Sequence, residues 1–171
     1  VVGEGVIVKL DSAYIDVGMG AQLYAEASGF NPTVFTSIRD TRYGRGGTFD
    51  TAMQGSAQLS AGDWAGIHAR GTSTLSLDHV VVAHAGGVAR VEGSFTGVNP
   101  IEVLHATARI ANSRFGHNLD GQSGQAPGSR DGRLFNGEAV IFGRGTEAVI
   151  VDDLMLESQA PMINVGINSM D

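Results

Sequence analysis

Two histidines are the residues of this sequence whose spacing first suggests chemistry. His84 and His117 lie 33 residues apart, and each follows a short apolar segment. If the fold repeats with that period, the two imidazoles stack on adjacent turns of the chain, where they could ligate a metal or act as a general base. The plainer interpretation is two half-exposed side chains at a turn. The matching place further on is expected to hold Ser158, so no third ligand is evident.

Carboxylates are the second group of residues that could do chemistry. Glycoside cleavage uses two of them, and Asp152–Asp153 is the one adjacent acidic pair. We expect a bend to require Asp153, which leaves Asp152 as a solvated neighbour. No catalytic residue is therefore assigned, and the candidate ligand-binding residues are Asp78, His84, His117 and Asp152.

A cation site is the third possibility. Asp120 and Asp131 each precede a glycine in a loop rich in turn-forming residues, and together they could hold Ca²⁺. Such residues more often bond to the backbone of their own turn. Calcium is therefore the one cofactor considered, and otherwise none is expected.

Several classes of function are excluded by what the sequence lacks. It has 171 residues, a net charge of −7, no basic stripe and no cysteine. Nucleic acid is therefore not expected as a partner. No apolar run is long enough to cross a bilayer, so membrane insertion is not expected. Gly143-Arg144-Gly145 lacks the Lys-Ser/Thr of a phosphate loop, and neither a Gly-x-Ser-x-Gly elbow nor a cysteine nucleophile is present.

The elements that must position these residues are short repeated segments. The frame at 110–118 recurs at 77–85 and at 151–159, with offsets of 33 and 41, which indicates a stacked supersecondary unit. Stacking of the units predicts that equivalent side chains line up in ladders. It also predicts a bend between two successive strands of each unit, and the residue at that bend needs a left-handed backbone. The predicted inward ladders are Leu77, Ile110 and Val151, and Val82, Phe115 and Leu156; the predicted bend residues are His79, Asn112 and Asp153.

The remaining sequence reads as strands and loops without helical periodicity. Short β-branched segments separated by glycine or polar pairs predict strands from residue 6 onward. Residues 67–77 align with 141–151 at an offset of 74. Two glycine-rich stretches, 39–63 and 119–134, are predicted to project as loops, with Trp64 fixing the return of the first loop against the core.

Four motifs resemble those of a known group of proteins. They are Asn31-Pro-Thr-Val-Phe-Thr-Ser-Ile38, Gly62-Asp-Trp-Ala-Gly-Ile67, Leu77-Asp-His-Val-Val-Val82 and Ile110-Ala-Asn-Ser-Arg-Phe115. They resemble segments of the right-handed parallel β-helix repeat proteins of bacterial secreted and cell-surface type, with the pectate-lyase-like superfold. The resemblance implies an all-β, right-handed parallel β-helix (a solenoid) of about four to five rungs with two projecting loops.

The functional expectations follow from this architecture. Residues 1–171 are expected to form one β-helix domain, as a fragment or processed piece of a longer chain. The first hypothesis is an extracellular structural or adhesive module of a surface protein or self-assembling filament, whose partner is another copy stacked end to end. The alternative is a carbohydrate-active enzyme, either a polysaccharide lyase or a glycoside hydrolase, or a module that binds extracellular glycan. An enzyme is the less expected outcome because no convergent polar cluster is evident.

Overall fold

All the regular structure in the described residues is β-strand. The computed structural model describes residues 1–44, 58–91, 93–121, 137–159 and 161–166, and no helix occurs among them. The all-β prediction is therefore confirmed. The strands are β1 (Ile7–Leu10), β2 (Ile15–Val17), β3 (Gln22–Glu26), β4 (Thr33–Ser37), β5 (Ile67–Arg70), β6 (Thr74–Asp78), β7 (Val80–Ala83), β8 (Val88–Val91), β9 (Ser94–Gly97), β10 (Ile101–Leu104), β11 (Thr107–Ala111), β12 (Arg114–Gly116), β13 (Ile141–Arg144), β14 (Glu147–Val151), β15 (Leu154–Leu156) and β16 (Ile163–Gly166).

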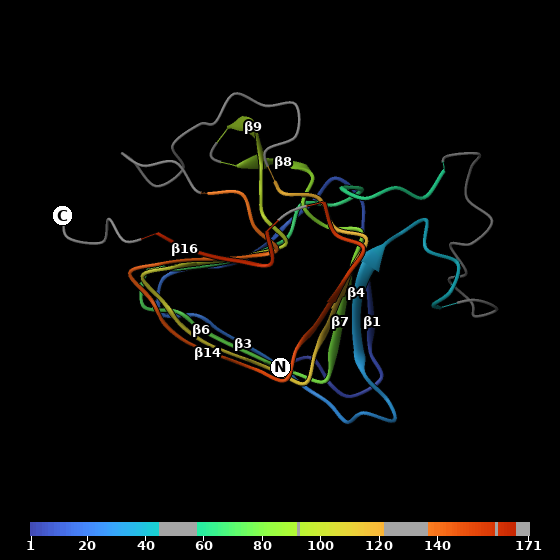
Figure 1. Ribbon diagram of the computed structural model, residues 1–171, viewed down its shortest axis with the longest axis horizontal. Coiled ribbons are helices and arrows are strands. Elements are labelled where there is room, and N and C mark those ends of the chain that lie inside the picture. Colours follow the sequence, from blue (N-terminus) through green and yellow to red (C-terminus); the bar gives the residue numbers. More distant parts are fainter. Residues whose placement is uncertain (45–57, 92, 122–136, 160, 167–171) are drawn as a thin grey trace.

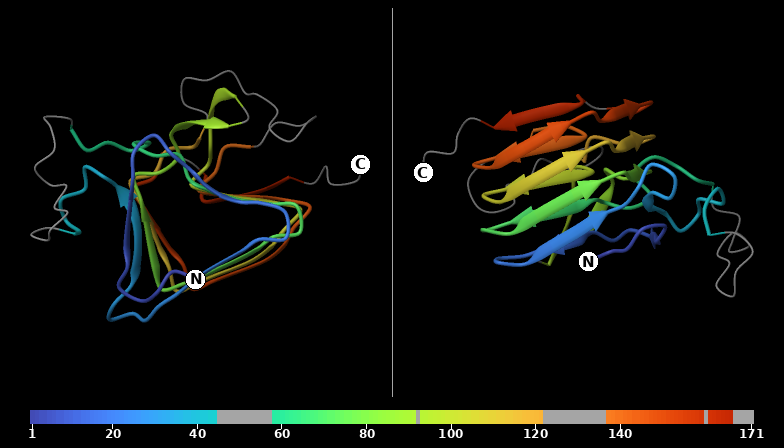
Figure 2. Two further views of the ribbon diagram at one scale, coloured as in Figure 1. Left: turned by 180° about the vertical axis from the view of Figure 1, so that it is seen from behind. Right: turned by 90° about the horizontal axis from the view of Figure 1, so that it is seen from below.

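Three parallel sheets form the sides of the molecule around a common core (Figure 1). The β7 sheet has the order β1-β4-β7-β12-β15, the β10 sheet β2-β5-β10-β13-β16, and the β6 sheet β3-β6-β11-β14. The chain visits the three sheets in turn, so each circuit lays one layer on the previous one, as the right panel of Figure 2 shows. The antiparallel pair β8–β9 lies outside this pattern.

Columns of like apolar residues fill the space between the sheets. In the β10 sheet the pairing of strands aligns one isoleucine from each of five strands: Ile15, Ile67, Ile101, Ile141 and Ile163. Isoleucine suits this position because its branched Cβ packs well on a pleated surface. The three middle members are at most 2% exposed. Each such burial contributes about 1.5–3 kcal/mol, which makes these columns the main source of stability.

The predicted ladders are right for two layers and wrong for the last. Ile110 pairs with Leu77, as predicted, but its partner in the next layer is Ile150 rather than Val151. By the same shift, Phe115 pairs with Val82 and with Met155 rather than with Leu156. Val151 and Leu156 are 45% and 44% exposed. A slip of one residue moves a strand side chain to the opposite face of the sheet.

The length of one turn explains this error. Three residues separate β5 from β6, whereas two separate β13 from β14. Ile67 and Ile141 share a column at the expected offset of 74, but beyond the shorter turn Leu75 shares a column with Ala148, at an offset of 73. The alignment of residues 67–77 with 141–151 kept the offset of 74 on both sides of the turn. It therefore missed the reduction to 73 that the shorter turn causes.

The bend between the β6 and β7 sheets has the predicted left-handed backbone. His79 and Asn112 have φ angles of 52° and 51°. In the last layer this role belongs to Asp152, with φ of 55°, and not to Asp153 as predicted. Asp153 instead accepts a hydrogen bond of 2.7 Å from the backbone N–H of Ser113, and so fastens the bend of the layer before it.

Only parts of the two predicted loops are described. Residues 39–44, which we call the arm, lie beside the β7 sheet, while 45–57 and 122–136, including Asp131, are outside the described residues. Trp64 lies in the core as predicted, fully buried, and its Nε1 donates to the carbonyl oxygen of Ala83 at 2.7 Å. In the described part of the chain there is no helix long and apolar enough to cross a membrane.

Candidate ligand-binding groove

A groove of about 300 Å³ lies on the outer face of the β7 sheet, next to the arm. Its floor has small side chains where β7 and β12 pair, because Ala83 lies beside Gly116. Larger residues surround this shallow strip. The lining residues are Arg42, Tyr43, Val81, Ala83, Arg114, Phe115, Gly116, His117, Leu156 and Glu157.

Asp40 holds the arm in place. Its carboxylate is fully buried and accepts hydrogen bonds from Thr36 Oγ1 at 2.7 Å and from three nitrogens of Arg42: the backbone N–H at 3.1 Å, Nε at 2.9 Å and Nη2 at 2.8 Å. Burial alone would raise the pKa of Asp40, but the bonds from Arg42 and Thr36 outweigh it and lower that pKa to about 2. The clamp fixes the Arg42 guanidinium at the edge of the groove.

His84 contacts the same guanidinium of Arg42. Arg42 Nη2 lies 3.0 Å from His84 Nε2, and since a guanidinium can only donate, this nitrogen of His84 is the acceptor. Burial lowers the pKa of His84; the nearby Asp40 carboxylate opposes that change, while the charge of Arg42 favours it. His84 is therefore neutral at pH 7, with its proton on Nδ1.

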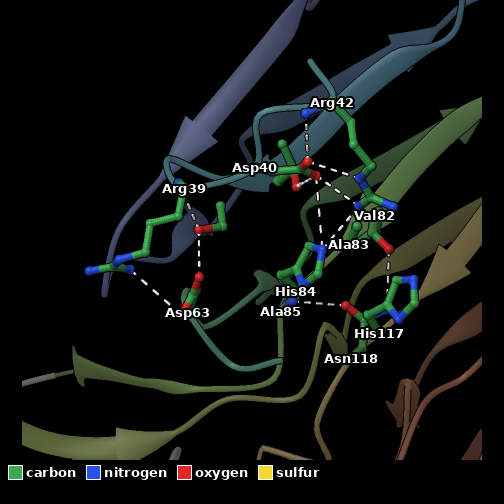
Figure 3. A network of polar contacts seen from close by, with 12 residues as sticks. Arg39, Asp40, Arg42, Asp63, Val82, Ala83, His84, Ala85, His117 and Asn118 are labelled. Atoms are coloured by element: carbon green, nitrogen blue, oxygen red, sulfur yellow. Dashed lines mark hydrogen bonds and ion pairs between the residues drawn. The ribbon is translucent and has the colours of Figure 1, made fainter. Parts of the chain in front are cut away.

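The predicted stacking of the two histidines is present. The rings of His84 and His117 are 5.3 Å apart between centroids and within 8° of parallel (Figure 3). His117 Nδ1 lies 3.0 Å from Glu157 Oε2. Because of the one-residue shift, Glu157 and not Ser158 is the next member of this column: its φ of 49° matches 61° at His84 and 57° at His117.

Asn118 fixes the two bends that carry these histidines. It is fully buried, its Oδ1 accepts from the N–H of Ala85 at 2.8 Å, and its Nδ2 donates to the carbonyl oxygen of Val82 at 3.1 Å (Figure 3). These bonds tie the end of β12 to the end of β7. The imidazoles are thus placed by backbone contacts between layers.

A second cation lies across the groove from the arm. Arg114 projects outward from β12, in a column with Val81 and Leu154, and is exposed. Within the described residues no carboxylate forms an ion pair with it. Arg42 and Arg114 therefore border an uncharged floor from two sides, with Glu157 as the one carboxylate among the lining residues.

The other predicted site residues lie elsewhere. Asp78 accepts from Arg109 at 2.7 Å and from Asn112 at 2.9 Å at the corner between β6 and β7, where Asp152 is a bend residue. Burial would raise the pKa of Asp78, but the bonds from Asn112 and Arg109 prevail and lower it. Only His84 and His117 of the four predicted ligand-binding residues adjoin the groove, where His117 is part of the lining.

Of the predicted calcium pair, Asp120 is described, whereas Asp131 lies outside the described residues. Among the described residues no three histidine, aspartate or glutamate side chains are grouped so that they could hold a metal ion. Comparison of the chain with protein-family models, with curated proteins and with solved structures gives no match.

Proposed function

We propose that the three parallel sheets form a right-handed parallel β-helix of the pectate-lyase-like type. The support is the order of the strands: each crossover leads to the next sheet and returns to the first one layer higher. Connections between parallel strands are right-handed in nearly all proteins. The five-stranded β7 and β10 sheets agree with the expected four to five rungs.

We propose that this chain is an adhesive module that binds a strand of acidic glycan in the groove. The observation that carries this proposal is the Asp40–Arg42 clamp, because a buried carboxylate holds an arginine at the rim of a shallow, uncharged floor. Asp40 and His84 occupy Nε and Nη2 of this guanidinium, so the two N–H donors of Nη1 remain to bond an oxygen of a carboxylate or sulfate. The small floor beside Tyr43 suits the apolar face of a sugar ring.

Binding fits the groove better than cleavage does. Hydrolysis of a glycoside commonly uses two carboxylates that flank the bond. The described lining contains one, Glu157, which is paired with His117. As an adhesive module the protein would act at the cell surface or outside the cell, where such polymers occur.

Binding of uronate oligosaccharides, measured by calorimetry against neutral oligosaccharides of the same length, tests the proposal. We expect the acidic ligands to bind and Arg114→Ala to weaken binding about tenfold or more, because a charge-assisted bond contributes about 1.5–3 kcal/mol. Arg109→Ala is the matched control: Arg109 is a half-exposed arginine on the β6 sheet, remote from the groove. Equal binding of neutral and acidic ligands, or equal losses in the two variants, would refute the assignment.

An assay for new reducing or unsaturated ends separates adhesion from catalysis. The proposal expects none from polyuronate incubated with the protein, with or without Ca²⁺. Sustained release of such ends would replace the adhesive role by that of an enzyme.

A further inference from the structure

The acceptor nitrogen of His84 is directed at a cation. Its side chain is only 7% exposed, and its Nε2 lies 3.0 Å from Nη2 of Arg42 (Figure 3). Its Nδ1 is buried and has no hydrogen-bond partner among the described residues. A second proton would have to go onto Nε2, where it would replace an accepted hydrogen bond by two N–H donors that face each other. The position therefore suits the neutral imidazole.

Charged or titratable side chains face His84 from the arm, from the end of β12 and from the segment before Trp64. They are Asp40 and Arg42, His117, and Asp63. The two carboxylates favour an imidazolium, whereas burial, which is the largest effect, the charge of Arg42 and the stacked His117 oppose it and lower the pKa of His84. Both carboxylates already have partners: Asp40 bonds to Arg42 and Thr36, and Asp63 pairs with Arg39 at 3.6 Å.

A proton on Nε2 would set the imidazolium of His84 and the guanidinium of Arg42 in competition for one carboxylate. Asp40 Oδ2 lies 3.9 Å from His84 Nε2 and accepts from Arg42 Nη2 at 2.8 Å. Two like charges 3.0 Å apart in a buried site repel each other strongly. Because the guanidinium is a rigid plane, displacing its Nη2 also redirects Nη1, the nitrogen that would bond the glycan.

We propose that His84 is a proton-operated switch of the glycan groove. Neutral His84 holds the Arg42 guanidinium in its binding position, and protonated His84 displaces it, so acidic glycan binds at neutral pH and is released at mildly acidic pH. This inference rests on the proposed function, because it concerns the regulation of the same groove. Charge attraction alone has the opposite sign: acid adds positive charge to the protein and would strengthen its binding of an anion.

The size of the effect follows from the linkage between protonation and the position of Arg42. Displacing Arg42 returns the pKa of His84 toward its ordinary value of about 6.5, so protons favour the displaced form. Only the fraction of molecules with neutral His84 is competent to bind. We expect the affinity for a uronate oligosaccharide to fall about threefold or more between about pH 7.5 and pH 5. The carboxylates of the ligand, with pKa values near about 4, stay mostly ionised over this range.

Calorimetry at the two pH values gives the ratio of the dissociation constant at low pH to that at high pH. His84→Gln removes the titrating group and keeps a side-chain acceptor for Arg42, so this ratio should fall to about one or below, whatever the absolute affinity. His105→Gln is the matched control, because His105 also has a left-handed backbone, with φ of 53° against 61° at His84, and lies between β10 and β11. It should keep the ratio of the unaltered protein. Equal or tighter binding by the unaltered protein at low pH, or an unchanged ratio in His84→Gln, would overturn the switch.

His117→Gln distinguishes the two stacked imidazoles. His84 contacts Arg42 directly, whereas His117 pairs with Glu157. We therefore expect His117→Gln to bind the uronate more weakly at low pH, as the unaltered protein does. Loss of the pH dependence in His117→Gln, with its retention in His84→Gln, would contradict the role given to His84.

Nuclear magnetic resonance of the ligand-free protein tests the switch without any glycan. Arg42 Nε–H donates to the buried Asp40 carboxylate at 2.9 Å, so we expect it to be protected from exchange with water at neutral pH. That protection should be lost with the same midpoint as the titration of the His84 ring protons, and His84→Gln should retain it. Protection that persists while His84 titrates would overturn the switch and leave the glycan groove as proposed. A coupled titration without binding of uronate at any pH would support the switch of Arg42 and refute the glycan as its ligand.

Discussion

Neutralising Asp40 tests how the arm is held. In Asp40→Asn the buried group loses its charge but nearly keeps its shape, so the variant imitates the protonated aspartic acid. The pKa of Asp40 falls from 3.8 to about 2 on folding. At about 1.4 kcal/mol per pH unit, ionised Asp40 stabilises the folded protein by about 2 kcal/mol at pH 7. We expect Asp40→Asn to lose that amount.

The stabilisation contributed by ionised Asp40 should depend on pH in a definite direction. The folded-state pKa lies below the unfolded value, so the stabilisation is complete well above pH 4 and is lost as the pH falls toward 2. About half of it should remain at pH 3. The difference in stability between the unaltered protein and Asp40→Asn should therefore shrink from about 2 to about 1 kcal/mol between pH 7 and pH 3.

Urea unfolding followed by Trp64 fluorescence measures this difference, because Trp64 is the only tryptophan and is fully buried. Asp11→Asn is the matched control: Asp11 also pairs with an arginine of the arm, Arg39, but its side chain is 45% exposed. Exposed pairs contribute little, so its loss should stay within about 0.5 kcal/mol. Equal losses in the two variants, or a loss in Asp40→Asn that is the same at pH 3, would refute the role given to the clamp.

Three further predictions examine other features of the fold. Burial lowers the pKa of His84, so the unfolded chain takes up its proton first and stability should fall as the pH drops below 6.5; His84→Gln should flatten this part of a stability–pH curve. Gly87→Ala would press its new Cβ into the backbone of Gly62 and should cost about 2 kcal/mol or more in urea unfolding, whereas a normal unfolding curve would contradict that close approach. Ile150→Ala should cost about 2 kcal/mol and Val151→Ala less than about 0.5; the reverse ranking would restore the register predicted from the sequence.

The repeated part of the fold could be predicted because each layer imposes the same demands on its residues. Leu77 and Ile110 had to be apolar to face the core, and His79 and Asn112 had to tolerate a left-handed bend. Such constraints recur at a fixed spacing and are visible in one sequence. The stacking of His84 on His117 followed from the same period of 33 residues.

Turn length and the groove could not be predicted in the same way. A turn can lose one residue without disturbing the strands that it joins, so nothing in the sequence marks the shift that brings Glu157 into the histidine column. Asp40 was missed for a different reason. It belongs to the arm, which does not repeat, and its partners Thr36 and Arg42 show their roles only once the arm lies on the β7 sheet. An acidic residue three positions after the end of the strand Thr33–Ser37 was the available signal.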